Sequence, residues 1–175
     1  MALADIVGVQ FRNLATVGGS LYGRFGFSDV LTVLMSMDAE VELYKAGRMP
    51  VEKYAVSGYE RDILVKVIIH KTPGCFAYEA VRLERTDIPV LNAACSRMDG
   101  KVRTVIGARP GKAMIVEDPK GLLNDGLTRD AVCAFAKYAA ETVPTGSNLR
   151  GSAVYRSHLV EVLTKRNLEK LGGLQ

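Results

Sequence analysis

The residues best suited to bind a ligand lie near the start of the chain, where two glycines stand between hydroxyl side chains in Thr16-Val17-Gly18-Gly19-Ser20. Glycine lacks the Cβ that would keep a phosphate or a planar ring away from the backbone. Consecutive backbone N–H groups in such a turn form a small positive hollow suited to a pyrophosphate, and the two hydroxyls add donors. Neither a Gly-x-Gly-x-x-Gly fingerprint nor the Gly-Lys-Ser/Thr of a Walker A loop is present. Composition alone therefore leaves two interpretations open, a phosphate site and an ordinary turn.

Other arrangements of reactive residues are less promising. His70 and His158 are not accompanied by the Gly-x-Ser-x-Gly elbow of a hydrolase triad, so we interpret both as structural. Cys75, Cys95 and Cys133 are odd in number and far apart, and no Cys-x-x-Cys occurs, which argues against a disulfide scaffold and against a zinc or iron–sulfur site. We expect no catalytic residue and no metal ligand in this chain.

A helix and a hairpin should position the glycine segment. Ser28 and Asp29 precede apolar residues at helical spacing up to Met37, and either of the two can cap that helix. Residues 40–44 alternate polar and apolar, which predicts a strand, and a Gly at position 47 turns the chain back.

The rest of the chain divides into a β part and a helical part. Four runs separated by turn signals predict three or four antiparallel strands: 62–69, which is rich in Ile, Leu and Val, then 76–83, 90–98 and 101–108. The last two runs are joined by Asp99-Gly100, a strong hairpin signal because such a turn needs positive φ. Prolines and glycines break up residues 110–126, to which we assign no element. Two helices follow over 129–141 and 153–171, with Thr128 and Ser152 as caps.

Composition restricts the class of protein. The chain has 175 residues, 48% of them hydrophobic, and 23 Lys+Arg against 19 Asp+Glu give a net charge of +4. That hydrophobicity excludes a disordered chain, and no apolar run reaches the roughly 18–20 residues of a membrane span. The basic residues are interspersed with acidic ones, so we expect a mixed surface and no nucleic-acid partner. We expect a cytoplasmic protein without a signal peptide.

Two longer motifs resemble a known family. The chain reads Phe-Arg-Asn-Leu-Ala-Thr-Val-Gly-Gly-Ser over 11–20, then Ser28-Asp29, then Asp38-Ala39-Glu40-Val41. Its far end reads Arg-Gly-Ser-Ala-Val-Tyr-Arg over 150–156. Both patterns are similar to those of the flavoprotein (medium) subunit of molybdenum hydroxylases, the xanthine dehydrogenase and carbon monoxide dehydrogenase group. The resemblance covers nearly the whole chain.

The resemblance implies an FAD site and an α+β fold. Residues 1–60 would be the second half of a flavin-binding domain, and 61–175 a C-terminal domain with a three-stranded antiparallel sheet and a helical bundle. Thr16, Val17, Gly18, Gly19 and Ser20 would form the second flavin loop, although Ser20 stands where the family usually has Asn. Asp29 would contact the FAD, for instance at a ribose hydroxyl, and Arg82 or Arg85 would be the basic residue that reaches the flavin.

The resemblance also implies partners and leaves one rival. The family's first glycine-rich loop has no counterpart here, so we expect little FAD binding by this chain alone, with a separate chain or a self-associated copy covering the exposed surface. Iron–sulfur and molybdopterin subunits would be the partners, and the chain would pass electrons from iron–sulfur clusters through FAD to NAD or another acceptor. The alternative is an assembly module that docks subunits without holding flavin.

Overall fold

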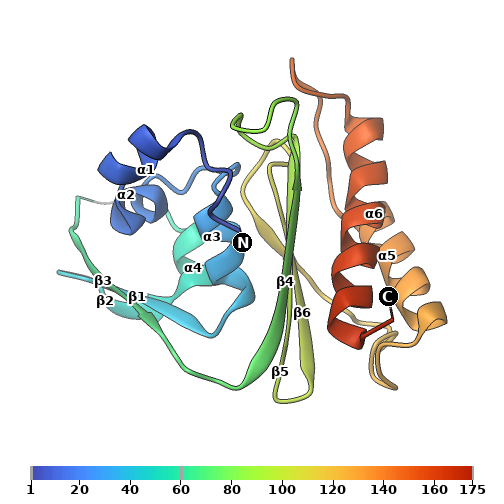
Figure 1. Ribbon diagram of the computed structural model, residues 1–175. Helices are drawn as coiled ribbons and strands as arrows, with labels where there is room; N and C mark the ends of the chain where they lie inside the picture. The colour runs from blue at the N-terminus through green and yellow to red at the C-terminus, as the bar shows by residue number, and fades with distance from the viewer. Residues whose placement is uncertain (1, 60, 175) are drawn as a thin grey trace.

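The computed structural model describes residues 2–59 and 61–174 and contains short helices, two antiparallel sheets and two long helices (Figure 1). The first part holds α1 (Val9–Leu14), α2 (Val17–Tyr22), α3 (Asp29–Ser36), β1 (Ala39–Leu43), β2 (Gly47–Pro50), α4 (Val51–Val56) and β3 (Leu64–Ile69). The second part holds β4 (Gly74–Val81), β5 (Leu91–Met98), β6 (Lys101–Gly107), β7 (Met114–Val116), α5 (Arg129–Thr142) and α6 (Ala153–Gly172).

Two sheets organise the chain. The smaller has the order β2-β1-β3, and the larger has the order β4-β5-β6-β7, with every pairing antiparallel. In Figure 1, α5 and α6 cover one face of the larger sheet, and α3 lies on its other face, between that sheet and the smaller one. The expected α+β class with antiparallel sheets is confirmed.

The strand assignments differ from expectation in two places. The predicted strand within 62–69 pairs with β1 and so belongs to the smaller sheet, not to the sheet that follows it. The larger sheet has four strands in the described part of the chain, not three, because β7 forms within the segment to which the sequence assigned no element. Strand pairing is decided by contacts distant in sequence, which a local pattern does not contain.

Turns and helix caps that depend on one or two residues form as the sequence predicts. Asp99 and Gly100 have φ of 48° and 76°, and Met98 pairs with Lys101 across them, which makes a two-residue hairpin turn. Thr128 and Ser152 cap α5 and α6 through their hydroxyls, as expected.

The interior has two apolar clusters, one on each side of the larger sheet. The cluster under α5 and α6 includes Phe135, Leu163 and Leu168, and the cluster around α3 includes Leu31 and Tyr54. α3 approaches β6 closely because Gly107 has no side chain: a Cβ there would lie 2.4 Å from the Thr32 hydroxyl. This close approach places the start of α3 against β4 and β5, where the candidate site forms.

Candidate functional site

The glycine segment is the first turn of a helix, not a loop. Thr16 is the N-cap of α2, and its Oγ1 accepts a hydrogen bond of 3.0 Å from the backbone N–H of Gly19. α2 forms despite its two glycines because Thr16 caps it and its Leu21 is fully buried. Gly18 and Gly19 therefore have ordinary helical backbone angles; what their lack of a side chain provides is space.

A cavity of about 390 Å³ opens beside this helix start. Its polar lining comes from Thr16, Ser20, Ser28, Asp29, Arg82 and Asp87, and its apolar lining includes Ile6, Val7, Phe11, Phe25, Phe27, Val30 and Ile88, with Gly19 between them. We call it the α2–α3 cavity. Its volume is at the lower end of the range typical of ligand pockets, roughly 300–1,000 Å³.

Arg12 fixes one wall of this cavity. Its Nη1 donates to the carbonyl oxygens of Ile6 and Val7 at 2.9 and 3.0 Å, which folds the first residues back over α1. Val7 has a positive φ of 47° at this bend. The Arg12 of the sequence motif thus has a structural role that its position beside the glycine segment did not reveal.

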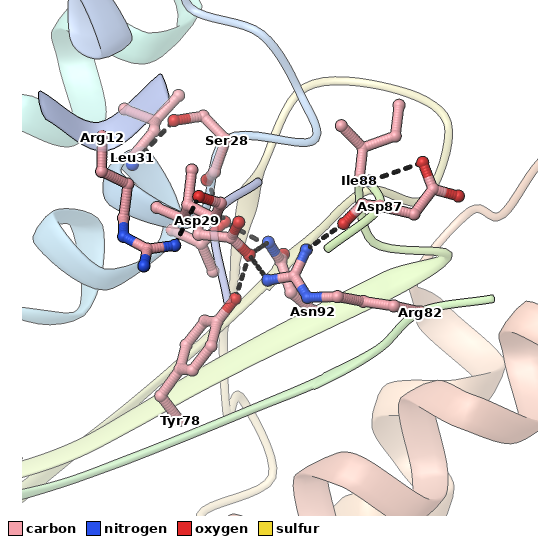
Figure 2. Close-up of polar contacts among 11 residues, drawn as sticks. Arg12, Ser28, Asp29, Leu31, Tyr78, Arg82, Asp87, Ile88 and Asn92 are labelled. Carbon is pink, nitrogen blue, oxygen red and sulfur yellow. Dashed lines mark hydrogen bonds and ion pairs between the residues drawn. The ribbon is translucent and has the colours of Figure 1, made fainter. Parts of the chain in front are cut away.

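Asp29 is the centre of a buried polar cluster at the other side of the cavity (Figure 2). It is the first residue of α3, only 5% exposed, and Ser28 rather than Asp29 caps the helix through a 3.2 Å bond from Leu31 N. The Oδ1 of Asp29 accepts hydrogen bonds from the Tyr78 hydroxyl, from Arg82 Nη2 at 2.9 Å and from Asn92 Nδ2 at 3.2 Å. Its Oδ2 has no hydrogen-bond partner within residues 2–59 and 61–174.

The donors around Asp29 are themselves held in place. Arg82 Nη1 donates to the carbonyl oxygen of Asp87 at 2.9 Å, and Asn92 Oδ1 accepts from the Thr32 hydroxyl at 3.1 Å. Burial, together with the adjacent carboxylate of Asp29, raises the pKa of the Tyr78 phenol well above its usual range, so the phenol stays a donor. The carboxylate is therefore fixed in position with one oxygen fully used.

The carboxylate of Asp87, a residue that also lines the cavity, connects this network to Arg150. The Arg150 guanidinium, 3.2 Å from Asp87 Oδ1, and the backbone N–H of Ile88 hold the pKa of Asp87 below its usual range. Asp87 thus links the strand end that carries Arg82 to the segment that precedes α6.

The structure brings part of the predicted site together. Thr16, Gly19, Ser20 and Asp29 line the α2–α3 cavity, while Val17 and Gly18 do not. Of the two basic candidates, Arg82 lines the cavity with its side chain 7% exposed. Arg85 points elsewhere: its side chain is 88% exposed, and it meets Asp5 at 3.4 Å.

Sequence reasoning missed Tyr78 and Asn92. A signal for Tyr78 exists, because it and Arg82 lie four residues apart and so share one face at the end of β4. Two polar side chains on one face of a strand that packs against a helix need buried partners. Asn92 lies within the apolar strand β5 and has no comparable signal.

The described residues offer neither a metal site nor a membrane-spanning helix. No group of three or more His, Cys, Asp or Glu side chains there could hold a metal ion. No helix among those described is long and apolar enough to cross a membrane.

The chain is similar to flavoproteins along its whole length. Residues 1–71 match the family model described as the FAD binding domain in molybdopterin dehydrogenase, and residues 76–171 match that of the CO dehydrogenase flavoprotein C-terminal domain. The nicotine 6-hydroxylase medium subunit of Paenarthrobacter nicotinovorans is 28% identical, over 93% of this chain and 62% of its own length. This chain thus spans about three fifths of the length of that curated relative.

Two solved structures have the same fold. The carbon monoxide dehydrogenase of Hydrogenophaga pseudoflava aligns with a TM-score of 0.85 at 22% identity, over 99% of this chain and 66% of its own. Quinoline 2-oxidoreductase of Pseudomonas putida 86 aligns with a TM-score of 0.82 at 19% identity, over 98% of this chain and 65% of its own.

Proposed function

Because the chain belongs to the family of FAD-binding medium subunits of molybdenum hydroxylases, we propose that the α2–α3 cavity is where it holds part of an FAD. The observation that carries this proposal is the Asp29 carboxylate, which is buried at the cavity with Oδ1 fully bonded and Oδ2 left for a ligand. Thr16, Val17, Gly18, Gly19, Ser20 and Asp29 are the proposed cofactor-binding residues.

The residues of the cavity fit the chemistry of such a cofactor. An FAD combines a pyrophosphate, sugar hydroxyls and two planar rings. The backbone N–H groups of Val17 and Gly18 at the start of α2 suit a phosphate, because the first turn of a helix leaves such groups without intrahelical partners, whereas the N–H of Gly19 is bonded to Thr16 Oγ1. The apolar wall formed by residues such as Phe11, Phe27 and Ile88 suits a ring. A cavity of about 390 Å³ takes only part of a dinucleotide, so FAD would also contact surfaces outside it.

Each residue has a proposed role. The Ser20 hydroxyl and the backbone N–H groups of Val17 and Gly18, which lie next to the cavity, would donate to phosphate oxygens. Gly19, whose own N–H is bonded to Thr16 Oγ1, would leave room for the phosphate. Asp29 Oδ2 would accept from a sugar hydroxyl. Arg82 would act as a positioning residue, because its Nη2 already donates to Asp29 and its Nη1 to the Asp87 carbonyl oxygen.

The wider function that we propose is electron transfer. Bound FAD accepts and releases electrons one or two at a time, and the protein supplies binding, orientation and exclusion of water. The proposed electron donors are the iron–sulfur clusters of a partner subunit, in a complex that also contains a molybdopterin subunit, and the proposed acceptor is NAD or another oxidant. We keep residues 1–60 and 61–175 as the proposed division into a partial flavin-binding domain and a C-terminal domain.

Equilibrium dialysis of the complete complex that contains this chain against FAD tests the site with a matched pair of glycine variants. In Gly19→Val, a branched side chain would enter the cavity, and its Cβ would lie 3.1 Å from the Thr16 hydroxyl. In Gly18→Ala, the added Cβ would meet only Leu64 at an ordinary 3.7 Å. We expect FAD binding to fall at least about tenfold in Gly19→Val and to stay at the parent level in Gly18→Ala.

Equal FAD affinity in the parent and in Gly19→Val would contradict the site. If the complex that contains this chain carries no flavin at all, the alternative of an assembly module without FAD is favoured. Electron transfer itself is tested in the purified complex: after reduction of its iron–sulfur clusters, the visible absorbance of the flavin should bleach and then return when NAD is added.

A further inference from the structure

A second cavity, of about 320 Å³, adjoins the α2–α3 cavity and shares Phe25, Phe27 and Ile88 with it. Four basic residues line it, Arg24, Lys112, Arg150 and Arg156, together with Phe25, Gly26, Phe27, Ile88, Pro89, Ala108, Pro110, Gly111 and Asn148. We call it the basic cavity. None of these lining residues is acidic.

The positive charge of this cavity is only partly compensated. Arg150 meets the carboxylate of Asp87 at 3.2 Å. Arg24 and Lys112 donate to backbone carbonyl oxygens of residues 56–58, and Arg156 donates only to uncharged oxygens. Burial and the nearby charge of Arg150 lower the pKa of Arg156. Of the four cations, Arg24 and Arg156 are buried, and neither pairs with a carboxylate in the described part of the chain. Arg24 lies over the rings of Tyr54 and Tyr59, with its Cζ 4.0 and 4.9 Å from their centroids, which stabilises its charge without neutralising it. Because buried charges are normally paired, this cavity favours an anion.

Two guanidinium groups at this cavity also have an unsatisfied N–H donor each. The Nε atoms of Arg24 and Arg150 are buried and have no hydrogen-bond partner in the described part of the chain. Arg24 is only 6% exposed, so water does not readily satisfy its Nε. A ligand with several acceptor oxygens would supply the missing partners.

The backbone around the cavity is held in a constrained form. Arg24 and Ala108 have positive φ of 46° and 57°, which non-glycine residues rarely adopt. A Cβ on Gly26 would lie 1.8 Å from the Gly111 carbonyl oxygen, so only glycine allows these two segments to meet. Strained residues persist where the surrounding structure fixes them, and they are frequent at ligand sites.

A planar group would find a surface at the cavity rim. The rings of Phe25 and Phe27 stack with centroids 5.2 Å apart and an interplanar angle of 9°, and both rings are partly exposed, at 54% and 40%. Partly exposed aromatic rings beside cations favour a ligand that joins an anionic group to a ring.

We propose that the basic cavity, which adjoins the α2–α3 cavity, is an anion site that binds a phosphate group through its own cations. The phosphate could be free or belong to a nucleotide whose base lies on the Phe25–Phe27 pair. This proposal does not depend on FAD binding at the α2–α3 cavity.

Isothermal titration of the 175-residue chain with inorganic phosphate, ADP and adenosine tests it. We expect saturable binding of phosphate and ADP and none of adenosine. Arg150→Gln and Lys112→Met should each weaken phosphate binding at least about tenfold, since each removes one cation at the rim of the site. Arg97→Gln removes an exposed cation elsewhere and should leave binding unchanged.

The titrations distinguish free phosphate from a nucleotide as the ligand, and the basic cavity from the α2–α3 cavity as the site. Tighter binding of ADP than of phosphate would assign the site to a nucleotide, and equal affinities would assign it to free phosphate. ADP binding that is lost in Gly19→Val but kept in Arg150→Gln and Lys112→Met would place the nucleotide in the α2–α3 cavity and overturn this proposal. Absence of saturable phosphate binding, or equal weakening by Arg97→Gln, would overturn it as well. Whether FAD binding depends on Gly19 is measured separately and decides only the proposed function.

Discussion

Two buried arginines on the larger sheet and its flanking segments show how differently one side chain can be used. Arg82 directly follows β4 and meets the Asp29 carboxylate at 2.9 Å, so its charge is compensated next to the α2–α3 cavity. Arg156 lies in α6, is 1% exposed and is held by four uncharged oxygens at 2.6–2.9 Å. Three of these are carbonyl oxygens, of Val90, Gly146 and Gly151, and the fourth is Asn148 Oδ1.

The difference indicates two separate tasks. The Arg82 pair fixes a carboxylate at a cavity, where an orientated acceptor can meet a ligand. Arg156 instead ties the segment before α6 to the start of β5, which makes it part of the framework, and its uncompensated charge adds to the basic cavity. We therefore expect that removing the Arg82–Asp29 pair lowers the free energy of unfolding less than removing the contacts of Arg156 does.

The largest expected effect follows from removing Arg156. Arg156→Met keeps much of the apolar volume but removes the donor to the buried Val90 carbonyl oxygen and to three partly buried acceptors, which should lower the free energy of unfolding by about 3–5 kcal/mol. Arg166→Met is the matched control, because Arg166 lies on the same helix with its side chain 59% exposed. Urea denaturation of both variants measures the difference. A loss below about 1 kcal/mol in Arg156→Met would show that the arginine is not a framework residue.

A smaller effect is expected at Asp29. Asp29→Ala removes the acceptor shared by Tyr78, Arg82 and Asn92, but the adjoining cavity admits water to part of the cluster. We expect a loss of about 2–3 kcal/mol in the free energy of unfolding, together with weaker FAD binding. Asp130→Ala, which removes an exposed acidic residue from the first turn of α5, should change neither quantity by much. Unchanged FAD affinity in Asp29→Ala would limit Asp29 to a structural role.

The smallest expected effect concerns Tyr78 and pH. Because the folded protein raises the pKa of this phenol above its ordinary value of 10.0, the unfolded chain loses the proton first as the pH rises. The contribution of Tyr78 is therefore complete below about pH 10 and declines above it. Tyr78→Phe should cost about 1 kcal/mol at neutral pH and should reduce the loss of stability above pH 10.

Denaturation curves at neutral and alkaline pH, with Tyr44→Phe as the exposed control, measure this difference. Identical alkaline profiles in Tyr78→Phe and the parent would show that the phenol does not bind Asp29 in solution.

The sequence indicated the parts of the fold whose signals are local. Ser28, Thr128 and Ser152 cap their helices because one hydroxyl and three residues define a cap, and Gly173 ends α6 in the left-handed conformation. The helix α2 was missed because its two glycines have low helix propensity, while the burial of Leu21 that supports it is a tertiary contact.

Only part of the candidate site could be predicted from the sequence. The glycine segment and Asp29 lie within 14 residues of one another, so one stretch of sequence contains both. Tyr78, Arg82 and Asn92 reach Asp29 from 49 to 63 residues further along, and the strand register alone brings them there. A pattern in one sequence contains no information on that register, so the cluster required the structure.

The most direct test of the proposed FAD site is an amide NMR titration of the chain with FAD, which detects weak as well as tight binding. We expect the largest shift changes at backbone amides of Thr16 to Ser20, at Asp29 and Val30, and at Ile88, because these residues line or adjoin the α2–α3 cavity. The same titration of Gly19→Val should show much smaller changes. Shift changes confined to other surfaces, or none at millimolar FAD, would contradict the assignment of this cavity to the cofactor.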